Sequence, residues 1–557
     1  MEFSQYRFQR FLPKFILCLP GYSARTFAAD LAAGITVGLV ALPLAMAFAI
    51  ASGLSPQAGI YCAVVTGFLI SLLGGSKMQI GGPTGAFVVV VYGILAKHGV
   101  HGLFLCTMMA GVMLVLMGLT GMGKAVQFIP RPVVMGFTNG IAVLIASTQI
   151  RDFFGLRLEH SPGEFFARMR ELAEHMGTVS WQATALGAAS LAIILLTPKI
   201  TKRVPGYIVA LVAATAASAA FKLPVETIGT RFGGIPSGLP HLEMPEFHVA
   251  MVLPLIAPAM TVAMLGAIES LMSAVVADSM SGDRHNPNVE LVAQGVANIV
   301  SPIFGGLPAT GAIARTATNI RSGAKTPVAG IVHSFTLLGV LLFAAPLARY
   351  IPMAVLAAIL FVVSYNMGQW AETIRLLRVT KSAVAVWLVT FGLTVMADLT
   401  TAVEVGMVLA ALTFIRNVAD STSVSPVTRD YILTGRPHVL HDKHIPDYVE
   451  VFSVQGALLF GASQKLEIIL NSLPKLPKVV VLRLRGMSAI DSTGIGAIED
   501  LSERVRASGR HLLLCGAKEH PSKLIHQPVF EEKIGHENIC ANIQEALDRA
   551  AELMEKA

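Results

Sequence analysis

Residues 304–316 read FGGLPATGAIART, and this short stretch decides how the chain must fold. It lies inside a long apolar region, yet it holds three glycines, a proline, two threonines and an arginine. Glycine and proline are unfavourable inside helices, and a charged side chain in hydrocarbon is costly. The stretch therefore has a purpose other than crossing a bilayer as a plain helix.

The chain around this stretch has the composition of a membrane protein. Of its 557 residues 54% are hydrophobic and 14% are charged, whereas soluble domains carry roughly 25% charged residues. Apolar runs, many of them about 20 residues long and so able to span a bilayer as helices, repeat from Phe27 to about Asn417. We expect about fourteen spans, forming a polytopic α-helical membrane domain in the lipid bilayer.

The basic residues indicate the orientation of these spans. The net charge of +7 comes mainly from residues at span ends, so it is no signal for nucleic-acid binding. With the N-terminus inside, the basic loops are cytoplasmic, as the positive-inside rule requires. We therefore expect a cytoplasmic amphipathic N-terminus at residues 1–26, carrying Arg7 and Arg10, and a transmembrane domain at 27–420. A cytoplasmic C-terminal part then covers 421–557.

Two segments far apart in the sequence resemble each other. GGPTGAF (81–87) and GGLPATGAI (305–313) each contain paired glycines, a proline, a threonine and then Gly-Ala before an apolar residue. Each lies in the third span of one of two halves of seven spans. Because seven is an odd number, the second half begins on the opposite side of the membrane, and the two halves have opposite orientations. Matched Gly/Pro-interrupted segments in inverted halves are the best sequence indication of a transporter's binding site.

A helix that begins inside a membrane leaves its first N–H groups without partners. These groups and the helix dipole favour an anion, and Pro83 and Pro308 suit a first helical turn. Two such half-helices with facing N-termini predict an anion site. Close packing of small residues between helices is the alternative interpretation.

Two charged residues fall deep in the predicted spans. Arg315 lies about one turn into the second half-helix and suits carboxylate or sulfate. Glu269 lies in the eighth span and could bind the coupled proton, with Ser273 on the same helical face. The alternatives are a structural ion pair of Arg315 with Glu269 or with a carboxylate elsewhere, and for Glu269 a solvated position at the helix end.

Enzymatic function is not indicated. The segment GLTGMGKA (118–125) has part of the Walker spacing but ends in Ala125 instead of Ser or Thr. The five cysteines show no metal-ligand spacing. We expect no enzyme activity, no cofactor and no metal site.

The pattern changes from about residue 447, where strand-like and helix-like segments alternate. This alternation predicts a small α/β domain. Asp491 to Gly494 read DSTG at a strand-to-helix junction, where Asp or Ser can cap the helix.

These motifs resemble the sulfate permease (SulP) family of anion transporters, which carry a C-terminal STAS domain. The resemblance rests on ITVGLVALPLAMAFAIASG (35–53), SPQAGIY (55–61), LGAIESLMSAVVADSMSG (265–282), DSTG and the two segments quoted above. It implies 7+7 inverted repeats in which a core domain (spans 1–4 and 8–11) moves against a gate domain (5–7 and 12–14) like an elevator. It also implies a homodimer.

The resemblance further implies site residues. The substrate-binding positions are Phe48, Pro83, Thr84, Gly85, Gly311, Ala312, Ile313, Ala314 and Arg315. Glu269 and Ser273 are the ion-coupling positions, and Ser492 matches a regulatory phosphorylated serine of related domains. Leu44 and the MLGAIES and AIAR motifs are closest to bacterial C4-dicarboxylate members.

We therefore expect proton-coupled uptake of a small anion, a C4-dicarboxylate or sulfate, across the inner membrane. Ile313 offers no side-chain oxygen, which argues against sodium as the coupled ion. Two alternatives stay open. One is sodium-coupled bicarbonate transport, and the other is an anion sensor that signals to a protein partner through the STAS domain.

Overall fold

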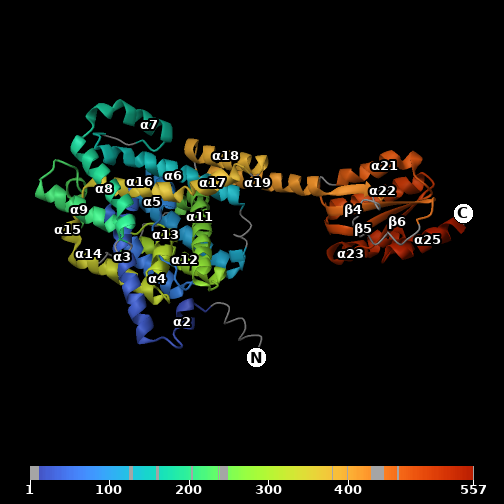
Figure 1. The fold of residues 1–557 in the computed structure, drawn as a ribbon, viewed down its shortest axis with the longest axis horizontal. Helices are drawn as coiled ribbons and strands as arrows, with labels where there is room; N and C mark the ends of the chain where they lie inside the picture. The colour runs from blue at the N-terminus through green and yellow to red at the C-terminus, as the bar shows by residue number, and fades with distance from the viewer. Residues whose placement is uncertain are drawn as a thin grey trace. The chain divides into compact units, whose positions relative to one another are not determined.

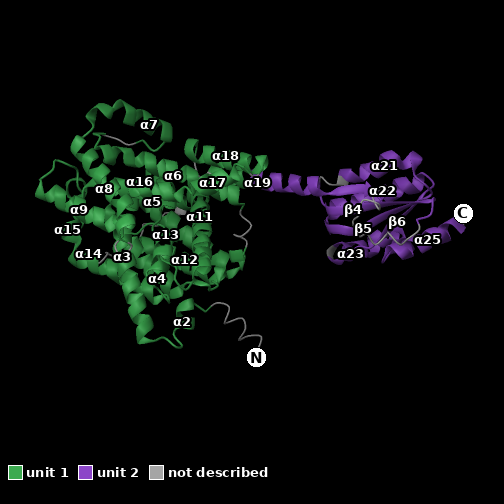
Figure 2. Ribbon diagram, in the orientation of Figure 1, with its two compact units in different colours: residues 1–407 green, residues 408–557 purple. Residues whose placement is uncertain are grey.

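A computed structural model describes residues 12–124, 130–158, 162–201, 205–235, 238, 242, 249–378, 380–397, 399–427, 445–460 and 463–555. Arg7 and Arg10 of the predicted amphipathic N-terminus lie outside the described residues, as does most of the predicted linker. The chain forms two compact units, residues 1–407 and 408–557 (Figure 2).

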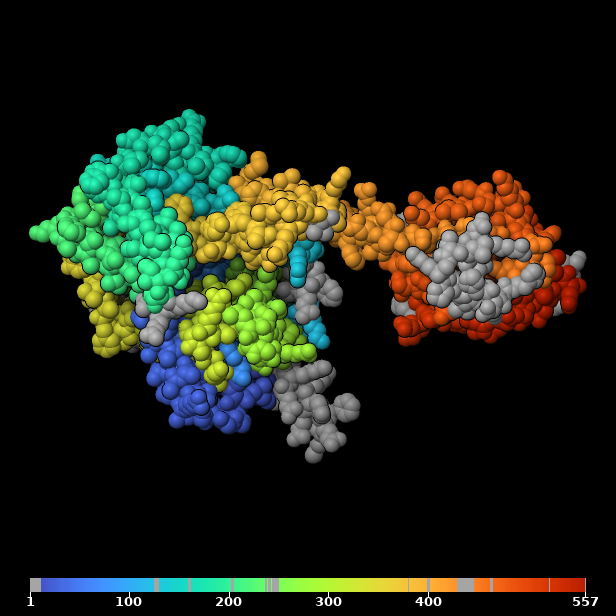
Figure 3. Space-filling model, in the orientation of Figure 1, coloured from blue at the N-terminus to red at the C-terminus, as the bar shows by residue number. Residues whose placement is uncertain are grey.

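The first unit is helical (Figure 1). Figure 3 shows one face of the molecule in space-filling form. The longer helices of its first half are α3 (Ala24–Ala51), α4 (Pro56–Leu73), α5 (Gly85–Leu119), α6 (Arg131–Phe154), α8 (Trp181–Ile200) and α9 (Gly206–Ala220). Those after residue 248 are α11 (Val249–Ser281), α12 (Pro287–Val300), α13 (Ile313–Arg321), α14 (Val328–Phe343), α16 (Met353–Met367), α18 (Lys381–Met396) and α19 (Leu399–Ser421), the last of which runs into the second unit. Short helices are α2 (Lys14–Cys18), α7 (Phe165–Glu174), α10 (Ile228–Phe232), α15 (Ala345–Ala348) and α17 (Trp370–Leu376).

These helices cover the apolar region in which about fourteen spans are predicted. In the described part of the chain, 8 helices have the length and apolar composition needed to cross a bilayer, and three shorter apolar helices accompany them. Two predicted spans share α5, which is broken at Gly99, where φ is 67°. The short helices α12 and α13 account for the remaining two predicted spans.

Glycine allows the first helices to pack closely against α14. A Cβ atom on Gly34 of α3 would lie 2.4 Å from the carbonyl oxygen of Ala329, which is shorter than any normal contact. Gly67 of α4 lies in the same way beside Ser334 of α14. Close approach through small residues is how helices associate in membranes.

The two Gly/Pro segments meet in the interior of this unit. β1 (Gly81–Gly82) pairs antiparallel with β2 (Thr310–Gly311), so that Gly81 faces Gly311. The amide of Ala312 also donates to the carbonyl of Ile80 at 2.8 Å. Helix α5 begins directly after the first segment and α13 directly after the second. We call this crossing, residues 80–85 and 309–313, the cradle.

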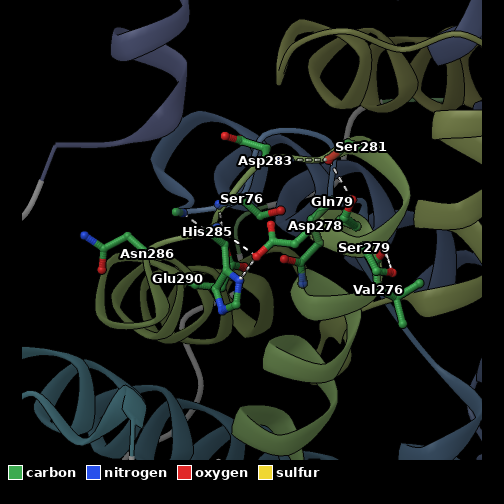
Figure 4. A network of polar contacts seen from close by, with 12 residues as sticks. Ser76, Gln79, Val276, Asp278, Ser279, Ser281, Asp283, His285, Asn286 and Glu290 are labelled. Carbon is green, nitrogen blue, oxygen red and sulfur yellow. Dashed lines mark hydrogen bonds and ion pairs between the residues drawn. The ribbon is translucent and has the colours of Figure 1, made fainter.

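Buried carboxylates fix the loops near the cradle. Glu290 of α12 accepts the amides of Gly75 and Ser76 at 3.0 and 3.2 Å, which holds the segment that leads into β1. Asp278 contacts His285 at 2.7 Å in the same network (Figure 4). The hydrogen bonds of Glu290 therefore hold the segment before β1 against α12.

The second unit is a five-stranded sheet with helices on both faces. The strands are β3 (Ser423–Pro426), β4 (Val449–Leu458), β5 (Val479–Ile490), β6 (His511–Cys515) and β7 (Ile539–Cys540), in that spatial order. Strand β3 is antiparallel to β4, and the other pairs are parallel. The longer helices are α22 (Ser492–Ala507) and α25 (Ile543–Glu555), and the shorter ones are α21 (Glu467–Ser472), α23 (Glu519–Ile525) and α24 (Pro528–Ile534). The predicted α/β domain is therefore confirmed.

The DSTG motif caps α22. The Asp491 carboxylate accepts the amide of Gly494 at 2.8 Å and that of Phe460 at 3.1 Å. Ser492 is the first residue of the helix and is exposed.

Candidate functional site

A cavity of about 240 Å³ lies beside the cradle. Helices α3, α5, α11 and α13 contribute residues to its lining, and so do α6, α9 and α16. Eight predicted site residues line it, namely Phe48, Thr84, Gly85, Glu269, Ala312, Ile313, Ala314 and Arg315. The structure thus brings together residues from four separate parts of the sequence.

Both half-helices start at this cavity. The N-cap residues are Thr84 for α5 and Ala312 for α13, and both have extended backbone. Neither N-cap side chain accepts a hydrogen bond from its own helix. The first N–H groups of each helix are consequently available to a ligand, and the positive ends of both helix dipoles favour an anion.

Glu269 projects from α11 beside the first of these helix starts. Its Oε2 atom accepts a hydrogen bond from the Thr84 hydroxyl at 2.9 Å. The carboxyl group is half-buried and lines the cavity. No ion pair joins it to Arg315, so the structural ion pair considered above is not formed between these two described residues.

Arg315 ties the two halves of the cradle together. It is 2% exposed, and its Nη2 group donates to the carbonyl of Pro83. Its Nη1 group has no hydrogen-bond partner within the described part of the chain. Gly82 makes room for it, because a Cβ atom there would lie 2.4 Å from Nη1. A buried guanidinium without a carboxylate is a strong attractor for an anion.

Three predicted residues lie outside the cavity lining. Ser273 is fully buried, and its hydroxyl lies 3.0 Å from that of Thr316, which also accepts the amide of Ile80 at 3.1 Å. Pro83 presents its carbonyl to Arg315, and Gly311 belongs to β2. Pro83 and Gly311 are thus part of the cradle itself, and Ser273 is linked to it through Thr316.

The comparisons with known proteins identify the family. Residues 27–390 match the family model described as the sulfate permease family, and residues 442–546 match the STAS domain. The chain belongs to the sulfate permease family. This confirms the predicted fold class, a helical membrane transport domain followed by a STAS domain.

Relatives of this permease family member are similar over nearly their whole length. It is 41% identical over 521 residues to a Bacillus subtilis protein named "Putative sulfate transporter YvdB", covering 93% of this chain and 97% of that one. It is 31% identical over 543 residues to the bicarbonate transporter BicA of Picosynechococcus, covering 94% and 95%. The protein is therefore a multi-pass membrane anion transporter and no enzyme.

Solved structures support the same fold. The murine anion transporter Slc26a9, described in an inward-facing state, superimposes with a TM-score of 0.85 at 20% identity, covering 98% of this chain and 95% of that one. The transmembrane domain of a cyanobacterial BicA gives a TM-score of 0.63 at 36% identity, covering 69% of this chain and 98% of that one.

Sequence reasoning missed the part of the cavity lining that comes from α6, α9 and the region of α16. Its polar members are Thr138 on α6, Tyr207 on α9, and Asn366 and Gln369 at the end of α16. Single polar residues in apolar helices form no motif, so no sequence signal identified them. Gln369 has a φ of 44°, a conformation that is uncommon outside glycine.

Replacement of Gly311 by alanine should destabilise the cradle. The added methyl group would lie 1.6 Å from Nε2 of Gln79, a buried amide that donates to the Ser270 carbonyl at 3.0 Å. We expect a loss of about 1–3 kcal/mol of stability, as for overpacked cores, measured as a lower Tm in detergent. The control is Gly339→Ala on α14, where a Cβ meets nothing within 4 Å. Equal Tm values for both variants would show that the crossing tolerates a larger residue.

Proposed function

We propose that this protein is a secondary active transporter that takes up a small anion together with protons. The observation that carries the proposal is the convergence of two half-helix N-termini, Arg315 and Glu269 on one cavity. In this mechanism the helix N-termini and Arg315 bind the anion. Glu269 binds the proton, which removes a negative charge beside the arriving anion.

The chemistry around Glu269 supports a proton over sodium. A sodium ion needs several oxygen ligands, and Ile313, which lines the cavity, supplies none from its side chain. The hydroxyl of Ser273 is already engaged with Thr316. A proton needs only the carboxylate itself, and the Thr84 hydroxyl can stabilise its charged form.

The cavity wall supports an anion with a carbon skeleton. Apolar lining residues include Val40, Leu44, Phe48, Val134, Phe137, Ile268 and Met272. Such surfaces cannot hydrogen-bond to an oxyanion, and burying a charge among them is costly. A C4-dicarboxylate can place its carboxylates at the helix ends and its carbon atoms against these walls. Sulfate is the second candidate, because relatives are named sulfate transporters.

Several features of the cycle belong to the same proposal. The cradle and α3, α4, α11 and α14 form a core that moves against a gate containing α6, α9 and α16. The transport domain covers residues 27–420, and the linker and STAS domain cover 421–557. The protein is a homodimer in the inner membrane, and both of its termini face the cytoplasm. Ser492 is a regulatory phosphosite, supported by its exposure at the N-terminus of α22, where a phosphate is electrostatically favoured.

Uptake into proteoliposomes tests the proposal. Purified protein is given labelled fumarate, sulfate or bicarbonate, each with an inward proton gradient or an inward sodium gradient. We expect saturable fumarate uptake with the proton gradient alone. Sulfate uptake under the same gradient would replace fumarate as the proposed substrate and would support the proposed proton coupling. Bicarbonate uptake that requires sodium would overturn both substrate and coupling ion.

A further inference from the structure

A histidine lies buried behind the cradle. His333 projects from α14 and is 0% exposed. Neither of its ring nitrogens has a hydrogen-bond partner in the described chain, although the carbonyl of Val37 on α3 is close by. A buried imidazole without partners is uncommon, because burying an unsatisfied polar group costs about 1–3 kcal/mol.

The ring of His333 lies beside the cradle. A Cβ atom on Gly67 of α4 would lie 3.3 Å from Cδ2 of His333 and 3.4 Å from the carbonyl oxygen of Gly81. The imidazole and β1 are therefore neighbours of the same glycine. The next residue of β1, Gly82, makes room for Nη1 of Arg315.

Arg315 and His333 are also close enough to interact electrostatically. Each of them has at least one buried nitrogen without a hydrogen-bond partner in the described part of the chain. The thiol of Cys62 also interacts electrostatically with Arg315, and it donates to the Leu307 carbonyl at 3.2 Å. No carboxylate of the described chain forms an ion pair with Arg315 there.

We propose that His333 is the positioning residue for Arg315. In its neutral form it donates one ring N–H to the Val37 carbonyl, which leaves the other nitrogen as an acceptor. That nitrogen is linked to Nη1 of Arg315 through one buried water, which donates to the imidazole and accepts from the guanidinium. Nη1 and Nη2 are then both held, the latter by Pro83, and the guanidinium plane is fixed at the cavity.

A neutral acceptor suits this role better than a carboxylate would. A carboxylate behind the cradle would pair with Arg315 and cancel the charge that attracts the anion. Imidazole orients the guanidinium and leaves its full positive charge to the substrate. The inference rests on the proposed role of Arg315 in anion binding.

The test compares the affinities of four proteins for labelled fumarate and for the anion that the uptake experiment identifies. They are the wild type, His333→Leu, Arg315→Ala and the double variant. We expect His333→Leu to raise KM about 10-fold with kcat nearly unchanged, as for loss of one hydrogen bond to a charged group. In the Arg315→Ala background the same change should have no further effect, because its target is absent. His333→Gln, which can also donate and accept, should restore most of the affinity.

Several outcomes would overturn this role. An unchanged KM in His333→Leu, or an equal loss in both backgrounds, would show that His333 acts independently of Arg315. An unchanged KM in Arg315→Ala would instead refute the proposed anion site itself, so the two failures are distinguishable. If His333→Leu does not fold, nitrogen-15 NMR can test the interaction instead. The histidine spectra of the reconstituted wild type and of Arg315→Lys are compared. A His333 nitrogen shift that is the same in both proteins would also refute the contact.

Discussion

Glu269→Gln is expected to abolish uptake driven by a proton gradient while leaving anion binding in place. Glutamine has the shape of protonated glutamate and can keep the hydrogen bond with Thr84, which now lies at 2.9 Å. It cannot bind or release a proton, so the proton gradient can no longer drive anion uptake. Initial uptake should fall to the level of protein-free vesicles, whereas exchange of labelled for unlabelled anion should persist.

The matched control for this variant is Glu290→Gln. Glu290 is another carboxylate of the membrane domain and is fully buried, but it holds the amides of Gly75 and Ser76 and does not line the cavity. Glu290→Gln should keep proton-driven uptake when the uptake is expressed per amount of folded protein. Full gradient-driven uptake by Glu269→Gln would refute the coupling role.

Arg315→Ala is expected to weaken anion binding by at least about 30-fold, since loss of one partner of a buried charged pair costs about 2–5 kcal/mol or more. The side chain supplies a positive charge that no ion pair neutralises in the described structure. Its removal also frees the Pro83 carbonyl. Arg315→Lys should lie between alanine and wild type, because lysine keeps the charge but lacks the planar donor pair.

The control for this second variant is Arg168→Ala. Arg168 is 6% exposed and donates to the carbonyls of Pro162 and Gly163 and to Ser147, away from the cavity beside the cradle. Its loss should lower Tm without changing anion affinity, measured by binding of labelled fumarate to purified protein. Equal affinities of Arg315→Ala and the wild type would remove Arg315 from the site.

The cradle could be predicted from the sequence because it contains residues that are unfavourable in a membrane-spanning helix. Glycine, proline and arginine in an apolar span are each unfavourable alone, so their repetition in two inverted halves indicates a site. The resulting prediction placed Thr84, Ile313 and Glu269 at one cavity, as the structure does. The α/β pattern of the C-terminal unit could also be predicted, because hydrophobic residues repeat with different periods in strands and in helices.

The rest depends on contacts between distant segments. Ser273 shares a helical face with Glu269 in the sequence, but its hydroxyl is turned to Thr316. Tyr207 and Asn366 line the cavity because helices α9 and α16 pack beside it, and nothing local marks them. His333 looks in the sequence like any polar residue of an apolar helix. Tertiary packing alone decides these roles.

The pairing of β1 with β2 has a mechanical consequence. Main-chain contacts join Gly81 to Gly311 and Ile80 to Ala312, and the Arg315 side chain adds a third tie to Pro83. Separating the two half-helices would therefore break buried hydrogen bonds. We expect them to move as one rigid piece, so that release of an anion requires displacement of the helices that face the cradle.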